Sequence, residues 1–361
     1  MSSSETRAAI AALADRIEAS PRRGRWLILT HDNPDPDALA AAAALSLVLR
    51  RKFGRTVTVA YGGIIGRSEN REMVRSLRLR LTHLRNLGKR KFEHYALVDC
   101  QPWTGNAQLS DGVVPDLVID HHPLRKATQS AAIVDVRPPY GSTATILAEY
   151  LAECEVQPPR ALATGLVYAI RSETQDFARE AGGPDHAAYD ALMPRVDRRL
   201  LARIQSARLP LVYFRNLQRA LVGLAGTANL VLSNLGPVDQ PDIVPEIADL
   251  LLRMEGKTWS LCTGSQGDRV YASIRTTNPR ADAGNLMRRL IGPLGKGGGH
   301  GTMAGGFVTI PKTAADGGRA IEKMLAQRFA QALGKNPERL APINLDSVAL
   351  DAPAPPESLA S

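Results

Sequence analysis

The sequence predicts an α/β protein, with a parallel sheet and crossover helices in an N-terminal domain and a smaller C-terminal α/β domain. Short apolar segments that suit buried strands alternate with longer segments that suit helices, which is typical of a parallel sheet. The chain of 361 residues is also longer than one hydrophobic core comfortably supports. Its content of 44% hydrophobic and 22% charged residues is ordinary for a globular protein.

The elements of the first half follow in regular order. Residues 1–20 contain charged side chains, which argue against a secretory signal and favour an amphipathic helix. Apolar and β-branched runs then predict strands, and alanine- and leucine-rich stretches predict helices between them. The predicted strands are 26–29, 56–60, 95–98, 117–119 and 133–136, and the predicted helices are 38–53, 67–77, 142–153 and 160–177.

The second half has a different composition. A basic helix over 187–207 is expected to link the two halves, and from residue 209 strands prevail, with a helix around 244–253. The tail is rich in Ala, Pro, Ser and Asp, which favours disorder. We therefore expect a first domain over 1–190, a helical linker over 191–208, a second domain over 209–340 and a disordered tail over 341–361.

Polar side chains that suit a metal ion follow three of the predicted strands. Open α/β sheets bind ligands at the carboxyl ends of their strands, so we expect these side chains to meet. Imidazoles and carboxylates together suit Mn²⁺, Mg²⁺ or Zn²⁺. The residues are His31, Asp35 and Asp37 after the first strand, Asp99 after the strand over 95–98, and Asp120, His121 and His122 after the strand over 117–119.

Some of these polar residues also have a simpler interpretation as helix caps. Pro34 and Pro36 keep the turn after the first strand extended, so the next helix is expected to begin after them, with Asp37 as its N-cap. Ser142 and Thr143 are likewise expected to cap a helix rather than contact a substrate.

The net charge indicates the kind of binding partner, and the cysteine content indicates the cellular compartment. The net charge of +9 favours phosphate-rich partners, and much of the basic excess lies in 67–91. That segment is either a solvated helix face or a surface that attracts nucleic acid. Three scattered cysteines fit a reduced cytoplasm, and no run approaches the length of a membrane span. Trp103 is the one tryptophan that we consider for stacking on a base.

The order of these motifs resembles the DHH/DHHA1 phosphoesterase superfamily over roughly residues 20–335. That superfamily includes RecJ-type exonucleases, nano-RNases, cyclic-dinucleotide phosphodiesterases and family II inorganic pyrophosphatases. The sequences Val-Asp-Cys-Gln-Pro at 98–102 and Ile-Asp-His-His-Pro at 119–123 are similar to those of the oligonucleotide-type members. The motifs are His31-x-x-x-Asp35-x-Asp37, the single Asp99, Asp120-His121-His122, and the later Gly297-Gly298-Gly299-His300.

The resemblance implies a catalytic centre with two divalent ions, Mn²⁺ in the first place and Mg²⁺ or others as alternatives. One ion would bind His31 and Asp35, the other Asp37 and His121, and Asp99 would bridge them. Asp120 would orient an imidazole, and His122 would contact the substrate phosphate. The implied reaction is hydrolysis of short single-stranded oligonucleotides or dinucleotides by a metal-bound hydroxide, in the cleft between the domains.

One position departs from the family pattern. Within 168–177, Glu173 stands where the family has an Asp that precedes Thr and completes the metal shell. We expect Glu173 to bind metal in its place, since a glutamate can also ligate these ions. Asp176, three residues further on, is the less favoured substitute.

The second domain is expected to bind the substrate. Gly297, Gly298 and Gly299 would let backbone N–H groups approach an anion closely, as nests do. Arg275 and His300 could add donors to a phosphate. No Walker A or dinucleotide-binding pattern accompanies them.

Two other functions remain alternatives. One is hydrolysis of phosphoanhydrides, as in pyrophosphatases and exopolyphosphatases, and the other is a catalytically weak module that binds nucleic acid or nucleotides. The expected partner is a short oligonucleotide or a nucleotide phosphoester, without membrane contact, and a homodimer is left open.

Overall fold

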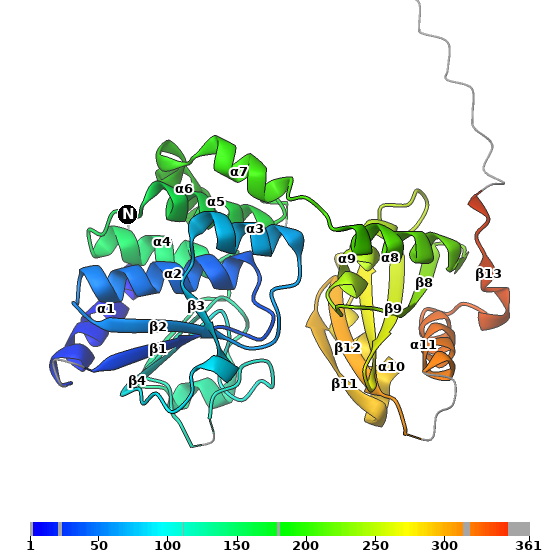
Figure 1. The fold of residues 1–361 in the computed structure, drawn as a ribbon, viewed down its shortest axis with the longest axis horizontal. Helices are drawn as coiled ribbons and strands as arrows, with labels where there is room; N and C mark the ends of the chain where they lie inside the picture. The colour runs from blue at the N-terminus through cyan, green and yellow to red at the C-terminus, as the bar shows by residue number, and fades with distance from the viewer. Residues whose placement is uncertain (1–2, 21–23, 111, 179–180, 313–317, 346–361) are drawn as a thin grey trace, which may run out of the picture. The chain divides into compact units, whose positions relative to one another are not determined.

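A computed structural model describes residues 3–20, 24–110, 112–178, 181–312 and 318–345. Figure 1 shows the helices and strands along the chain. They form two compact units, Met1–Arg208 and Leu209–Ser361. The three cysteines are buried and free, and none of the described helices is both long and apolar enough to cross a membrane.

The first unit contains the predicted parallel sheet. Its six strands pair in the order β3-β2-β1-β4-β5-β6, and all neighbours run parallel. The chain order reverses between β1 and β4, which lie side by side in the centre. The strands are β1 (Arg25–Leu29), β2 (Thr56–Tyr61), β3 (Leu81–His83), β4 (His94–Val98), β5 (Leu117–Asp120) and β6 (Ile133–Val136).

Helices share one core with one face of this sheet. Trp26 and Ile28 of β1 pack into the helical core, whereas Leu27 and Leu29 point to a smaller cluster formed with loop residues such as Leu84. This alternation is the period-two pattern of a strand buried on both faces. The helices are α1 (Ser4–Glu18), α2 (Pro36–Arg51), α3 (Ser68–Leu77), α4 (Thr143–Glu153), α5 (Arg160–Glu173), α6 (Gly183–Leu192) and α7 (Arg198–Gln205).

The start of α2 corrects the predicted cap. The helix begins at Pro36, two residues earlier than expected, and its N-cap is Asp35, whose side chain accepts the N–H of Ala38 at 3.0 Å. Proline suits the first helical position because the N–H that it lacks would have no partner in the helix there. The prediction that Asp37 is the N-cap was therefore wrong. Asp37 lies inside the first turn, and its carboxylate is available for another role.

The predicted basic helix over 187–207 is interrupted. It consists of the end of α6, a 3₁₀ turn at Met193–Arg195 and α7. Pro194 lies in that turn, where its ring is compatible with the backbone. α7 packs against α3 and α5, so it belongs to the core of the first unit.

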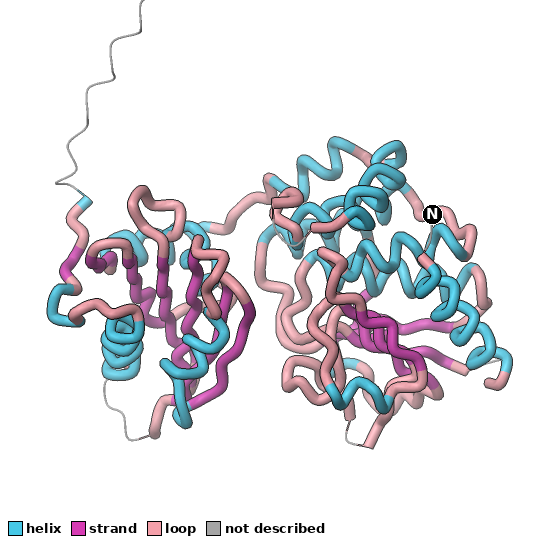
Figure 2. Tube along the Cα trace, turned by 180° about the vertical axis from the view of Figure 1, so that it is seen from behind, coloured by secondary structure: helices cyan, strands magenta, loops and turns pink. Residues whose placement is uncertain are grey.

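The second unit is a mixed sheet with helices on both faces, and Figure 2 distinguishes its strands from its helices. Its order is β11-β12-β10-β9-β8-β7-β13, in which β8 and β9 run parallel and the other pairs antiparallel. α8 and α9 share one core cluster, and α10 and α11 share the other. The elements are α8 (Leu211–Val222), β7 (Leu224–Thr227), β8 (Leu230–Pro237), α9 (Ile243–Leu251), β9 (Trp259–Gln266), β10 (Arg269–Thr276), α10 (Ala283–Ile291), β11 (Gly295–His300), β12 (Met303–Thr309), α11 (Arg319–Ala332) and β13 (Ala341–Pro342).

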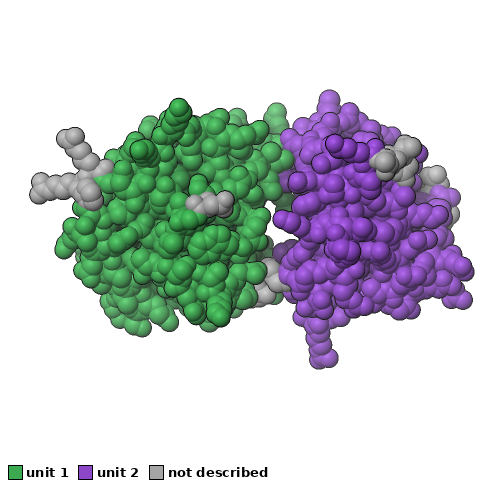
Figure 3. All heavy atoms as spheres, turned by 90° about the horizontal axis from the view of Figure 1, so that it is seen from below, with its two compact units in different colours: residues 1–208 green, residues 209–361 purple. Residues whose placement is uncertain are grey.

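The C-terminal segment differs in part from the expected disordered tail. β13 pairs with β7, so the first residues of that segment belong to the sheet. Residues 346–361 lie outside the part of the chain that the structure describes. Figure 3 colours the two units separately.

Candidate metal centre

Polar side chains from three strands meet at one edge of the first sheet. β1 and β4 are neighbours at the point where the strand order reverses. Ligands of open α/β sheets bind at such a switch point, outside the carboxyl ends of the strands. The side chains are His31, Asp35 and Asp37 after β1, Asp99 after β4, and Asp120, His121 and His122 at the end of β5.

The first cluster joins the loop after β1 to the end of β4. The Nε2 atom of His31 lies 3.8 Å from Asp35 Oδ2 and 3.4 Å from Asp99 Oδ2. The other ring nitrogen, Nδ1, lies 2.9 Å from the carbonyl oxygen of Asp32 and can donate a hydrogen bond to it. In that tautomer the Nε2 lone pair is directed at the two carboxylates, the arrangement in which a neutral histidine binds a metal ion.

The second cluster lies on the other side of Asp99. His121 Nε2 is 3.8 Å from Asp99 Oδ1 and 3.9 Å from Asp37 Oδ2. Its Nδ1 atom lies 3.2 Å from the carbonyl oxygen of Tyr140, which again leaves Nε2 for a ligand. His122 also lies close, with its Nδ1 atom 3.9 Å from Asp99 Oδ1.

Asp99 therefore belongs to both clusters, with one oxygen directed at each. Its φ of 59° is left-handed, which is uncommon for a residue other than glycine. The N–H of Asp99 donates to the carbonyl oxygen of Ile119 at 2.9 Å, so the neighbouring strand holds this backbone in place. A single carboxylate so placed can ligate two cations at once.

The atoms of both clusters fit divalent cations. Nε2 of His121 is buried and has no hydrogen-bond partner among the described residues. Its separations from the carboxylate oxygens are too long for hydrogen bonds. They suit atoms that each lie about 2.0–2.2 Å from one cation. The same chemistry describes the first cluster, which also combines an imidazole with two carboxylates.

The charge of the site also favours a cation. Burial, together with the charges of Asp99, Asp35 and Glu173, raises the pKa of Asp37 well above its usual range. Burial alone would lower the pKa of His31, but its polar and charge contacts with Asp35 and Asp99 raise it. Both shifts reflect several carboxylates held close together, and a divalent cation would relieve their repulsion.

The N-terminus of α4 contributes a residue that the sequence analysis did not place in the site. The N–H groups of Thr143 and Ala144 each donate to Asp37 at 2.7 Å. The hydroxyl of Thr143 donates to Asp99 Oδ1 at 2.8 Å. Ser142 is the N-cap, as expected, but Thr143 contacts two candidate ligands, so its prediction as a mere cap was wrong. The signal in the sequence is the hydroxyl pair Ser142 and Thr143, which begins the helix after β6.

A second network holds His122. Its Nδ1 atom lies 2.8 Å from Asp120 Oδ1, and Asp120 Oδ2 accepts the amide of Gln101 at 2.7 Å. Burial would lower the pKa of His122, but the hydrogen bond to Asp120 and the charge of Asp99 raise it to about 9. The side chain of His122 is 38% exposed, against 7% for His121, so His122 is the one that a substrate can reach. Gln101 is a further residue that sequence reasoning missed.

The two carboxylates near the end of α5 have different surroundings. Glu173 is the last residue of α5, and its charge acts on both Asp37 and His122. Asp176 is largely exposed and pairs with Arg171 at 2.5 Å. Of these two carboxylates, Glu173 is therefore the one whose charge acts on residues of the clusters.

The glycine-rich stretch of the second unit is a strand and not a loop. Residues Gly295–His300 form β11, the strand at the edge of the sheet, and pair with β12. The expected concave nest is therefore absent from this stretch, because the N–H groups of a strand alternate in direction. A Cβ on Gly297 would lie 2.9 Å from Met287 Cγ, and one on Gly299 would lie 2.5 Å from Ala304 Cα. Close packing thus explains these two glycines, whereas a Cβ on Gly298 would meet open space.

The donors predicted beside these glycines differ in how they are placed. Arg275 in β10 is buried, and its Nε donates to Asp249 while Nη1 donates to Ser273 Oγ at 2.7 Å. Its guanidinium therefore already has partners within the second unit. The side chain of His300, at the end of β11, lies outside the described part of the chain.

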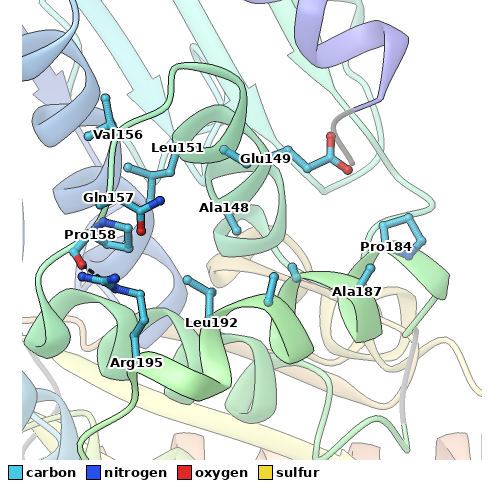
Figure 4. A pocket seen from close by; sticks show the side chains of 13 residues that line it. Ala148, Glu149, Leu151, Val156, Gln157, Pro158, Pro184, Ala187, Leu192 and Arg195 are labelled. Atoms are coloured by element: carbon cyan, nitrogen blue, oxygen red, sulfur yellow. Dashed lines mark hydrogen bonds between the residues drawn. The ribbon is translucent and has the colours of Figure 1, made fainter.

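A pocket of about 210 Å³ in the first unit has a different character (Figure 4). It lies against α4 and α6, and its lining is mostly apolar. Arg195 at its edge donates to the carbonyl oxygen of Pro158 at 3.2 Å. None of the predicted site residues lines this pocket, so it is separate from the clusters around Asp99.

The parallel sheet with its two clusters, and the mixed sheet of the second unit, together define a two-domain α/β protein with a candidate metal centre. The chain belongs to the DHH/DHHA1 phosphoesterase superfamily. Residues 25–170 match the DHH family, N-terminal domain, and residues 228–331 match the DHHA1 domain. The resemblance seen in the sequence motifs is thereby confirmed.

Two similar proteins extend this comparison. An uncharacterized protein of Methanocaldococcus jannaschii is 34% identical over 292 residues, which cover 80% of this chain. The match spans 59% of that relative, so this chain corresponds to about three fifths of it. The structure of an exopolyphosphatase-related protein from Bacteroides fragilis superposes with a TM-score of 0.72 over 90% of this chain and 96% of that one. At 14% identity this likeness shows the fold alone.

Proposed function

We propose that this protein is a metal-dependent phosphodiesterase that hydrolyses short single-stranded oligonucleotides or dinucleotides. The observation that carries the proposal is the shared carboxylate of Asp99, with one oxygen toward His31 and the other toward His121. Family membership supports the reaction class. The sequences at 98–102 and 119–123, which resemble those of the oligonucleotide-type members, favour a nucleotide substrate.

The residues divide into two ligand sets. His31 and Asp35 would hold one cation, Asp37 and His121 the other, and Asp99 both. Divalent ions, with Mn²⁺ proposed first, would offset the charge of the phosphodiester and make a water molecule acidic enough to supply hydroxide near neutral pH. The N–H groups of Thr143 and Ala144 at the start of α4 donate to the carboxylate of Asp37 and so fix its orientation.

His122 is proposed to contact the substrate phosphate. Asp120 accepts the hydrogen bond of Nδ1, which fixes the ring and stabilises its protonated form. In the metal-free protein the raised pKa of His122 favours the charged imidazole at neutral pH. Its Nε2–H can then donate to a phosphate oxygen, and such a charge-assisted bond is stronger than a neutral one.

Substrate contacts are also proposed for the second unit. The surface at Gly298 would remain open to a ligand because no atom lies within 4 Å of the position of a Cβ there. Gly297 and Gly299 would contribute backbone groups of β11, and His300 a side chain. Arg275 would have to exchange its contact with Asp249 for a phosphate.

The test is a panel of substrates with defined metals. Wild-type protein is incubated with a dinucleotide, a five-nucleotide strand, pyrophosphate and polyphosphate, each with Mn²⁺, Mg²⁺ or Zn²⁺, and the products are separated by chromatography. We expect cleavage of the two nucleotide substrates that EDTA abolishes. Hydrolysis of pyrophosphate or polyphosphate alone would favour the phosphoanhydride alternative. Oligonucleotide binding without any product would favour the binding module.

Trp103 gives a second way to separate these functions. Its side chain is 49% exposed, on a loop that Gln101 anchors to Asp120. Stacking of a base on an aromatic ring contributes about 1–3 kcal/mol, and pyrophosphate has no base. We expect Trp103→Ala to raise KM for the dinucleotide, whereas Trp103→Phe keeps it. An equal change in KM for pyrophosphate would contradict the stacking role.

A further inference from the structure

We propose that a basic pocket between α3 and α7 binds the phosphate backbone of a longer oligonucleotide, beyond the nucleotides held at the metal centre. This inference rests on the proposed function and extends it from dinucleotides to longer single strands. The pocket has a volume of about 450 Å³ and lies entirely within the first unit. Its charged lining consists of Arg71, Arg75, Arg203 and Arg208 with Glu72.

The two walls of the pocket come from helices that pack together. Arg71 and Arg75 lie on α3, four residues apart, so their Cα atoms differ by roughly 6 Å along the helix axis. Arg203 lies on α7, and Arg208 follows that helix. The fold therefore turns arginines from two helices toward one hollow, whereas a merely solvated helix would spread them over its outer face.

The arginines of α3 are held in position. Arg75 donates to one oxygen of Glu72 from Nε at 3.0 Å and from Nη2 at 2.5 Å. Arg71 donates to the carbonyl oxygen of Gly66 at 2.5 Å and to Ser68 Oγ at 3.0 Å. Glu72 is the one acidic residue in the lining, so the pocket keeps a positive excess.

The opposite wall offers cations that an anion can recruit. Arg203 and Arg208 are exposed, and the charge of Arg203 acts on the carboxylate of Glu72 on the facing helix. Gathering like charges in one hollow costs stability. A chain of phosphates would reverse that cost, because each arginine can bind phosphate oxygens in a bidentate manner.

The pocket is connected to the metal centre through α3. The amide of Asn70 donates to the carbonyl oxygen of Pro34 at 3.3 Å, and this contact is buried. Pro34 directly precedes Asp35, and Asn70 directly precedes Arg71. The helix that forms one wall of the pocket is thus attached to the loop that supplies a candidate metal ligand. A strand that leaves the metal centre along α3 would meet the arginines next.

The test uses the double variant Arg203→Gln/Arg208→Gln in the full chain. Binding of a fluorescein-labelled single-stranded 8-mer is followed by anisotropy in EDTA at several salt concentrations. We expect Kd at low salt to rise about tenfold, because two phosphate contacts are lost. The slope of log Kd against log salt should fall by about 1.4, since each contact to a single strand contributes about 0.7.

A matched control removes the same charge elsewhere. Arg51→Gln/Lys52→Gln changes two exposed cations at the C-terminal end of α2, about 24 Å along that helix from the metal loop. Its Kd should stay within twofold of wild type. With Mn²⁺ present, kcat/KM for a dinucleotide should be the same in wild type and both variants, because a dinucleotide does not reach the pocket.

Several outcomes would overturn the pocket assignment. The first is a pocket variant whose Kd for the 8-mer equals that of wild type. The second is a control variant whose Kd rises as much as that of the pocket variant. The third is a larger rise in the Kd for polyphosphate than in the Kd for the 8-mer when the two arginines are replaced. A wild-type protein that cleaves neither the dinucleotide nor the five-nucleotide strand would instead refute the proposed function. The anisotropy measurement does not depend on hydrolysis and would still decide the pocket.

Discussion

Asp99 shows how a single residue can determine the chemistry of a site. It directly follows a central strand, its backbone is left-handed, and its two oxygens face different imidazoles. Only part of this was predictable. The position after a strand indicates a ligand, but the direction of each oxygen depends on the register of β4 against β5. The cap at Asp35 instead of Asp37 was missed because the proline at the first helical position shifts the start of α2.

Asp99→Asn is expected to abolish most of the hydrolysis while keeping the fold. Asparagine tolerates the left-handed backbone, whereas alanine would add strain. The lost carboxylate should lower kcat by at least about 100-fold. In EDTA the variant should melt no lower than wild type, because one of several repelling carboxylates is gone. Activity within tenfold of wild type would contradict a bridging role.

Glu173→Ala is expected to abolish most of the hydrolytic activity, whereas Asp176→Ala is expected to change the activity little. The charge of Glu173 acts on Asp37 and His122, whereas Asp176 pairs with Arg171. Glu173→Asp should be partly active, because a carboxylate displaced by about 1 Å can cost about 10²-fold in rate. Manganese titrations of all three variants would check this order. Full activity in Glu173→Ala with loss in Asp176→Ala would reverse the assignment.

At the scale of elements, the first turn of α4 and the edge strand β11 were the hardest to predict. Five of the six strands of the first sheet are apolar runs and were found from the sequence, whereas β3 was missed because its three residues, Leu81–His83, are only half-buried and short. β11 has four glycines and no apolar residue in six positions, so only its pairing with β12 and its packing against α10 explain it. In α4, capping and ligand support use the same residue types, and the sequence does not distinguish them.

Thr143→Val is expected to lower kcat about tenfold with a small effect on stability. The substitution removes the hydroxyl that donates to Asp99 but keeps the N–H that donates to Asp37. Loss of one support of a metal ligand typically costs about 10–100-fold in activity or metal affinity. Thr143→Ser should behave as wild type. Equal losses in the valine and serine variants would point to packing instead.

Glu149 should make the attachment of α1 dependent on pH. Burial raises the pKa of Glu149, but hydrogen bonds from Thr6 and Ser3 outweigh this and hold it below its usual value. The carboxylate therefore stabilises the fold fully above about pH 4.5 and loses this effect as the pH falls through the lowered pKa. Urea midpoints of wild type and Glu149→Gln should differ at pH 7, by about 1–3 kcal/mol in unfolding free energy. The difference should shrink at pH 3.5, and an unchanged difference would contradict the prediction.

At the scale of the whole molecule, the two units separate the metal ligands from the glycine-rich strand. All candidate ligands lie in the first unit, and β11 lies in the second. The sequence predicted two domains because the chain is longer than one hydrophobic core supports and its composition changes near residue 209. It did not predict α8 over 211–222, where leucine, valine and aromatic residues also suit a strand.

His300→Ala is expected to raise KM for a dinucleotide without changing metal affinity. The residue belongs to the second unit, so the ligand sets of the first unit remain complete. Loss of one charge-assisted hydrogen bond corresponds to about 1–3 kcal/mol in substrate binding. Calorimetric titration with Mn²⁺ checks the metal. Weaker Mn²⁺ binding in this variant would contradict the assignment of metal binding to the first unit and substrate contact to the second.

The carboxylate that faces both clusters also has a thermodynamic consequence. An ion at one cluster neutralises part of the charge that would attract an ion to the other, so the two occupancies are linked, and the linkage is reciprocal. The second ion should bind more weakly than the first, and the isotherm should have two steps. Over the range of free Mn²⁺ between these steps the protein would be half-loaded, so its turnover would follow the supply of metal as well as the supply of substrate.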